Sequence, residues 1–215
     1  MKPFIQFIAT ATASVAFATS ALAAAPASAE APDVFVKRIS TEILDSVKAD
    51  KEIQAGNRNK IMGLVNTKIL PHVDSEKMTM QAAGRFWRQA TPEQQKRLSE
   101  EFRTLLVYTY AGALSQVDNQ TVEFKPLRAE AGATDVEVRS QVNVARGEPI
   151  TLNYRVAKGA QGWKIYDLNV MGAWLVETYK STFTSQINKG GIDGLIKTLA
   201  DRNAQLASKP LKAPK

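Results

Sequence analysis

Hydrophobic and polar residues alternate along three short segments between Asp135 and Val170, and this pattern predicts three β-strands. In the first two segments the apolar residues fall on one parity, so one face of each strand should pack inward while the other meets water. These apolar positions are Val136, Val138, Val142 and Val144 in the first segment and Ile150, Leu152, Tyr154 and Val156 in the second. Glycine-containing turns separate the segments, which favours an antiparallel meander.

The third segment, Trp163 to Val170, changes parity within its length. Trp163 and Ile165 share one parity, and the apolar residues from Tyr166 onward share the other. Two interpretations fit this pattern: the strand is apolar on both faces, or a bulge near Tyr166 and Asp167 shifts the parity. Either one implies a curved, well-covered sheet whose concave side would enclose an apolar space.

A fourth strand is predicted at Thr121 to Leu127, and Pro126 places it at the edge of the sheet. Spacings of three and four residues predict helices from Asp33, over Lys60 to Leu70 and after Asp74. Further helices are predicted from Thr91, where Thr91-Pro92-Glu93-Gln94 is a capping-box signal, then after Gly172, and from Ile192 after a break at Gly190-Gly191. The segment from Thr104 to Val117 carries no acidic or basic side chain except two tyrosines, so the sequence predicts a helix buried on all sides there.

These elements predict one α+β domain over residues 33–207. Its expected architecture is a curved antiparallel sheet of about four strands, packed with about six helices around an apolar cavity. The tail, residues 208–215, contains Pro210 and Pro214 and is expected to be disordered.

The first 23 residues have the features of a signal peptide. Lys2 gives a positive start, an apolar run follows, and Ala21-Leu22-Ala23 supplies the small residues that a signal peptidase reads. Ala27-Ser28-Ala29 is a second such site, so the mature chain is expected to start at either Ala24 or Glu30. Residues 24–32 are then an Ala/Pro linker. The sequence therefore predicts export.

The chain contains no cysteine, which excludes a lipid-anchored lipoprotein, disulfides and thiol chemistry. Its formal net charge is +7, and removal of Lys2 with the signal peptide leaves +6. Because an exported protein does not meet nucleic acid, this charge fits an anionic membrane surface, an acidic protein partner, or a solvated surface that aids solubility.

The side-chain inventory argues against an enzyme. His72 is the only histidine, and no Gly-x-Ser-x-Gly elbow or clustered acidic motif accompanies it. Asp167 and Glu177 are the one candidate acid/base pair, although isolated carboxylates beside a sheet are usually surface groups. No cofactor or metal site is expected. Aromatic residues fall on the predicted elements, where they either fill the core or line a cavity for an apolar ligand.

Several motifs resemble the MlaC family, also called toluene-tolerance auxiliary proteins. The resemblance covers about Val34 to Asn203 and rests on Ile69-Leu70-Pro71-His72-Val73-Asp74, Gly84-Arg85-Phe86-Trp87-Arg88-Gln89-Ala90-Thr91-Pro92-Glu93-Gln94, Tyr154-Arg155-Val156, Gly162-Trp163-Lys164-Ile165-Tyr166-Asp167 and Gly191-Ile192-Asp193-Gly194-Leu195-Ile196. One local departure is Ala173-Trp174 after Gly172, where the family often has an aliphatic residue and a serine.

This resemblance implies a monomeric periplasmic phospholipid carrier with bound phospholipid as its ligand. Such carriers move lipid between an inner-membrane ABC transporter complex and an outer-membrane lipoprotein–porin complex, which maintains outer-membrane lipid asymmetry. The alternatives are a periplasmic adaptor or chaperone-like module that binds protein and no lipid, and a small hydrolase that uses His72. From the predicted inward faces, the cavity-lining residues are expected to be Leu106, Tyr110, Leu114, Val138, Leu152, Tyr154, Ile165, Leu168, Trp174, Tyr179 and Phe183.

Overall fold

The computed structural model describes residues 30–130, 132–144 and 147–212, and its α+β architecture confirms the predicted fold class. The predicted signal peptide and residues 24–29 of the predicted linker lie outside the described residues. Within the described part, no helix combines the length and the apolar character that crossing a bilayer requires.

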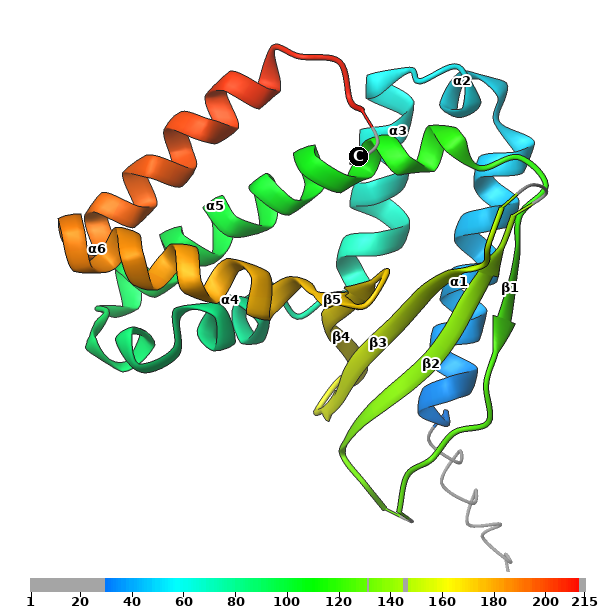
Figure 1. Cartoon of the computed structure of the whole chain (residues 1–215), viewed down its shortest axis with the longest axis horizontal. Coiled ribbons are helices and arrows are strands. Elements are labelled where there is room, and N and C mark those ends of the chain that lie inside the picture. The colour runs from blue at the N-terminus through cyan, green and yellow to red at the C-terminus, as the bar shows by residue number, and fades with distance from the viewer. Residues whose placement is uncertain (1–29, 131, 145–146, 213–215) are drawn as a thin grey trace, which may run out of the picture.

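One open antiparallel sheet contains all five described strands in the order β1-β2-β3-β4-β5 (Figure 1). Their bounds are Thr121–Phe124, Asp135–Asn143, Ile150–Gly159, Gly162–Val170 and Ala173–Trp174. Each strand pairs with the next, which confirms the meander, and β1 lies at the edge that Pro126 predicted.

The fifth strand was not predicted, because the sequence was expected to enter a helix directly after Gly172. Val170 instead pairs with Ala173 across a two-residue turn. Both turn residues, Met171 and Gly172, have positive φ angles of 53° and 90°. A two-residue hairpin turn of type I′ requires a positive φ at both central residues.

The change of parity in β4 comes from a bulge. Arg155 pairs with Asp167, but Val156 pairs with Ile165, so Tyr166 is the extra residue on β4. The bulge interpretation is therefore confirmed. It returns Leu168 to the same face as Ile165, and the apolar side of the sheet continues across it.

The described part contains six α-helices: α1 Pro32–Ala49, α2 Lys51–Gln54, α3 Arg58–Leu64, α4 Ser75–Ala83, α5 Pro92–Tyr110 and α6 Leu175–Ala207. Shorter helical turns of other types are η1 Val65–Ile69, η2 Leu70–His72, η3 Gly84–Gln89 and η4 Ala111–Gln116.

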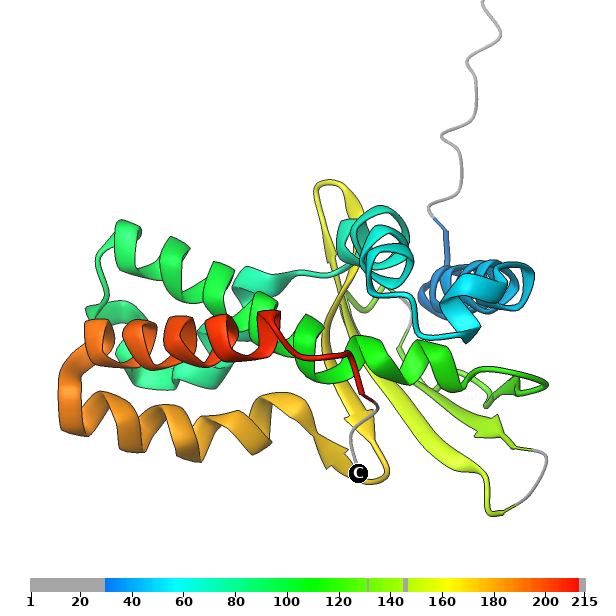
Figure 2. The ribbon, with the colours of Figure 1, turned by 90° about the horizontal axis from the view of Figure 1, so that it is seen from above.

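Local sequence signals set the ends of these helices. The Thr91 hydroxyl accepts the backbone N–H of Gln94 at 3.2 Å, and the Gln94 side chain accepts the backbone N–H of Thr91 at 3.0 Å, which confirms the capping box at the start of α5. Gly191 has φ 68° and ψ −174°, so it divides α6 into two arms, as the Gly-Gly pair predicted. Figure 2 shows these arms running side by side in opposite directions.

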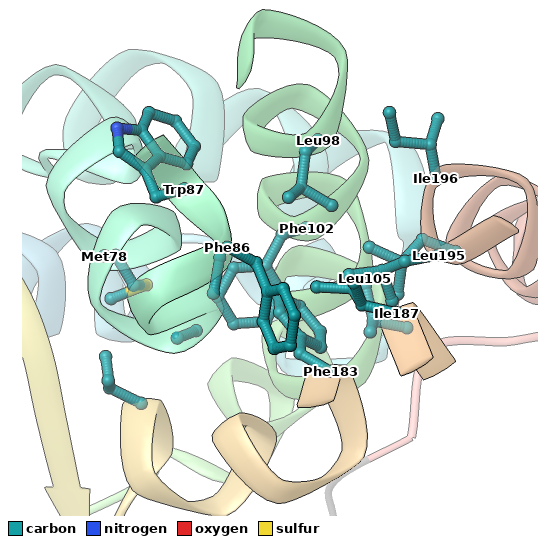
Figure 3. Close-up of a cluster of buried hydrophobic side chains, with 14 residues drawn as sticks. Met78, Phe86, Trp87, Leu98, Phe102, Leu105, Phe183, Ile187, Leu195 and Ile196 are labelled. Atoms are coloured by element: carbon teal, nitrogen blue, oxygen red, sulfur yellow. The ribbon is translucent and has the colours of Figure 1, made fainter. Parts of the chain in front are cut away.

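Helices lie on both sides of the sheet. One lobe combines α4, η3, α5 and both arms of α6, and a core of aromatic and aliphatic side chains holds it together (Figure 3). On the other side α1 packs against the sheet through Phe35, Val36 and Ile39. A third cluster joins the C-terminal end of α1 to α2, α3 and η4.

The prediction that the uncharged segment from Thr104 to Val117 is buried on all sides is wrong. Leu105, Ala111 and Gly112 are buried, but every residue from Leu106 to Tyr110 is only half-buried. Figure 1 shows the reason: this end of α5 extends beyond the helix lobe, so protein covers only part of its circumference.

Residues 208–212, which fall in the stretch expected to be disordered, have packed positions. Leu211 packs against the third cluster, and the Arg58 guanidinium donates to the carbonyl of Lys209 at 2.7 Å. A side chain at Gly112 would collide with the backbone of Lys212, so the close approach of this segment requires glycine there.

Candidate functional site

The eleven residues predicted to line one cavity are divided among the packing clusters. Five lie on the sheet in the cluster with α1: Val138, Leu152, Tyr154, Ile165 and Leu168. Three lie in the helix lobe: Leu106, Tyr179 and Phe183. Leu114 belongs to the third cluster, and Tyr110 and Trp174 are half-buried residues with polar or cationic contacts. Their role as a lining stays a prediction.

The five sheet residues share one face, and that face looks toward α1. Val138 pairs with Tyr154, and Tyr154 pairs with Leu168. The Tyr154 hydroxyl lies 3.3 Å from the hydroxyl of Ser40 on α1, which fixes the direction of the face. Val138, Tyr154 and Ile165 are buried there, whereas Leu152 and Leu168 remain half-exposed.

Phe183 does not share this face. It is inaccessible to solvent and packs edge-on against Phe102 of α5, with ring centroids 4.9 Å apart. Tyr179 packs against the same Phe102 ring, also at 4.9 Å. Phe183 therefore holds α5 and α6 together as a core residue, whereas the partly exposed Tyr179 stands at the border of the lobe.

Half-exposed apolar side chains from the sheet and from the end of α5 form the strongest candidate for a binding surface. Leu152 and Leu168 contribute from the sheet, and Val107 and Leu114 contribute from α5 and η4. Ile43 of α1 packs against the buried residues of both clusters, so it lies where the two clusters adjoin. Uncharged side chains that are left partly uncovered suit an apolar ligand.

Ile43 and Val107 belong to this surface but were not among the residues predicted to line a cavity. Both carried a usable signal, because Ile43 lies in the helical spacing of α1 and Val107 lies in the uncharged segment of α5. The sequence could not show that both pack against the same cluster, since they are 64 positions apart and this arrangement depends on how α1 packs against η4.

A polar contact links α5 to α6 beside these apolar groups. The side chains of Tyr179 and Tyr110 lie close enough to influence each other's pKa, so two of the predicted residues do meet. Burial is the main cause that raises the pKa of Tyr179 to about 12, and burial also raises the pKa of Tyr110. Both hydroxyls therefore stay neutral near pH 7.

The Asp167 carboxylate is placed for structure and not for acid/base catalysis. It is inaccessible to solvent, and its oxygens accept the backbone N–H groups of Leu168 at 2.9 Å and Val176 at 3.0 Å. Arg155 donates to the same carboxylate at 3.2 Å and stacks over the Trp174 ring at 3.9 Å. Burial raises the pKa of Asp167, and these hydrogen bonds oppose that shift.

Glu177 is exposed, whereas Asp167 is enclosed and its carboxylate is already hydrogen-bonded to two backbone N–H groups. No group of three His, Asp or Glu side chains within residues 30–130, 132–144 and 147–212 is arranged to hold a metal ion.

Comparison with known proteins gives a consistent result. The family model described as MlaC protein matches residues 37–201. The intermembrane phospholipid transport system binding protein MlaC of Haemophilus influenzae is 25% identical over 183 residues, which cover 84% of each chain. The toluene tolerance protein ttg2D of Pseudomonas putida is 29% identical over 166 residues, or 77% of each chain.

A related protein of known structure was solved with a bound ligand. The phospholipid-binding protein from Ralstonia solanacearum, determined in complex with a phospholipid, is 50% identical to this chain and superposes with a TM-score of 0.77. The match covers 82% of this chain and 98% of the Ralstonia chain.

Proposed function

The chain belongs to the MlaC protein family, and from this membership we propose that it is a periplasmic phospholipid carrier. It takes phospholipid from an inner-membrane ABC transporter complex or an outer-membrane lipoprotein–porin complex and delivers it to the other. It maintains outer-membrane lipid asymmetry in this way. The name of the Haemophilus relative, which places that protein in an intermembrane phospholipid transport system, supports this role.

The observation that carries the proposal is the bound phospholipid of the Ralstonia protein, because half of the aligned residues are identical and nearly all of that chain is matched. The MlaC family consists of lipid-binding transport proteins and not of enzymes. The enclosed Asp167 agrees with this, since its carboxylate is occupied by backbone N–H groups and Arg155.

Apolar burial supplies the affinity that a carrier needs. Each methylene removed from water contributes about 0.8 kcal/mol, so two acyl tails of about fifteen methylenes each contribute on the order of 24 kcal/mol. A bilayer offers nearly the same free energy. Transfer between membrane and carrier is then close to neutral, and no chemical step is required.

The acyl chains are expected to contact the half-exposed apolar surface formed by Leu152, Leu168, Val107 and Leu114, with Ile43 at the junction. The eleven residues predicted from the sequence are retained as a hypothesis for the surrounding lining. Of these, Phe183 acts through the packing of α5 against α6, because its own ring is covered by Phe102.

Native mass spectrometry of the protein purified from periplasm without detergent tests the carrier function. We expect a mass excess that organic extraction resolves into phospholipid. Leu152→Glu should lose this excess, because a carboxylate would replace an apolar contact of the acyl chains. Thr151→Glu is the matched control, since Thr151 precedes Leu152 on β3, points to the other face and is exposed.

Two results would contradict the proposal at different levels. If the Leu152→Glu variant is folded and has full lipid content, Leu152 does not belong to the binding surface. If the wild-type protein carries no lipid, and takes up none after incubation with phospholipid vesicles, the protein is not a phospholipid carrier.

A further inference from the structure

A hollow lies at the opposite end of β4 from the β4–β5 turn. Its volume is about 380 Å³, which is within the size range of small-molecule sites. Three separate parts of the chain form its walls: the start of α1, the η2 turn and the β3–β4 hairpin. None of its lining residues belongs to the apolar surface assigned above to acyl chains.

Positive charge predominates around this hollow. Arg38, Lys158 and Lys164 line it, and the one acidic wall residue is Glu30. Glu30 is already paired with Arg38 through hydrogen bonds of 2.8 and 2.9 Å. Lys158 and Lys164 form no ion pair with any residue in the described ranges, so no carboxylate neutralises their charge there.

His72, the only histidine of the chain, completes the polar wall. Val73 forms a parallel bridge with Ile165, and the preceding residues on the two segments, His72 and Lys164, are consequently neighbours. The chain brings these two residues together from positions 92 apart, which no local sequence pattern indicates.

Buried aromatic side chains fix the shape of the hollow. Phe35 is 4% exposed and Trp163 is 8% exposed. The indole N–H of Trp163 donates to the carbonyl of Glu30 at 2.9 Å, and the Phe35 ring lies edge-on to His72 with centroids 5.8 Å apart. The walls are therefore held by the core packing of α1 on the sheet and are formed before any ligand arrives.

We propose that this hollow is a binding site for a phosphate monoester with a small organic body. A phosphate monoester presents three acceptor oxygens and up to two negative charges, which suit a wall that is mainly positive and carries an imidazole. The aromatic walls suit the carbon part of the molecule. Two sources share this chemistry: a soluble phosphate ester, and the headgroup of a monoester lipid in a membrane surface.

His72 provides a single reporter for the test, because the protein has one imidazole. Its pKa lies below the ordinary histidine value, first because of burial and then because of Arg38 and Lys164, while Glu42 and Glu30 oppose that shift. Glycerol 3-phosphate bound beside it should raise this pKa. We expect a saturable shift of the His72 imidazole NMR signal with glycerol 3-phosphate that sodium chloride of equal ionic strength does not reproduce.

The double variant Lys158→Ala/Lys164→Ala should weaken glycerol 3-phosphate binding by about tenfold or more, since it removes both charge-assisted contacts. Lys96→Ala/Lys189→Ala is the matched control, because it removes the same charge from exposed lysines outside the hollow. Absence of a saturable shift in the wild type, or equal binding in the two double variants, overturns the proposal.

Vesicle sedimentation separates the two sources. If the ligand is a lipid headgroup, wild-type protein should sediment with phosphatidic acid vesicles and not with phosphatidylcholine vesicles, and the Lys158/Lys164 variant should stay in solution. If it is a soluble ester, the variant and the wild type sediment alike while still differing in glycerol 3-phosphate binding. Phospholipid content after purification should be unchanged in the variant, so failure of this site and failure of the carrier function are distinguishable.

Discussion

The carboxylate of Asp167 on β4 accepts the backbone N–H of Val176, in the first turn of α6, at 3.0 Å. Trp174, the N-cap residue of α6, offers no side-chain acceptor to that turn. A side chain of the sheet therefore accepts a backbone N–H in the first turn of α6 that has no partner within the helix. The partial positive charge at this helix N-terminus also favours the carboxylate. The contact joins the sheet to the helix lobe.

Asp167→Ala is expected to lower the free energy of unfolding by about 3 kcal/mol, because it leaves two backbone N–H groups and Arg155 without their buried acceptor. Urea unfolding measures this change. Asp201→Ala is the control: Asp201 forms an exposed i,i+4 pair with Lys197, and its loss should cost less than about 1 kcal/mol. Equal stability of the two variants would show that Asp167 does not hold α6 to the sheet.

Gly191→Ala is expected to destabilise the protein by about 1–3 kcal/mol, because φ 68° with ψ −174° is a conformation that alanine adopts only with strain. Gly190→Ala provides a close control. Gly190 has no positive φ, and an added Cβ would meet no atom within 4 Å, so this change should be neutral or stabilise the helix by up to about 1 kcal/mol. If Gly190→Ala unfolds at a lower temperature than Gly191→Ala, the helix break at Gly191 is refuted.

Acid sensitivity is expected from His72. Its folded-state pKa is lowered from 6.5, so the unfolded chain takes up a proton more readily than the folded protein. The free energy of unfolding should consequently fall as the pH drops below about 6.5 toward the lowered folded pKa. His72→Gln should remove this part of the dependence between pH 7.5 and 5.5. An unchanged pH profile in the variant would mean that the imidazole is not shielded by its surroundings.

Tyr179 is expected to titrate near pH 12, because burial disfavours its phenolate. Because the folded pKa of Tyr179 is raised, the free energy of unfolding should fall as the pH rises from about 10, the ordinary tyrosine pKa, to about 12. The protein has five tyrosines. NMR of protein labelled at the tyrosine ring carbons measures the pKa of Tyr179 directly, and Tyr179→Phe assigns its signal. A Tyr179 signal that titrates near 10 would place the ring in solvent.

Local pattern was enough for most of the secondary structure. Alternation over residues 135–156 predicted paired strands, and Thr91 with Gln94 predicted the start of α5, because both signals act between residues close in sequence. The parity change after Ile165 indicated a bulge as one of two interpretations. Family resemblance, carried by motifs along the whole domain, predicted the function that the comparisons support.

Tertiary packing decided the features that depend on distant residues. The sequence of α5 shows where charge is absent, but the position of the lobe relative to the sheet decides that Val107 and Leu114 are half-exposed. The sequence places Phe183 on an apolar helix face, and only the folded structure shows that its ring packs against Phe102. Contacts such as Asp167 with Val176, or His72 beside Lys164, depend on which surfaces meet in the folded chain, and hydrophobic periodicity carries no information about that choice.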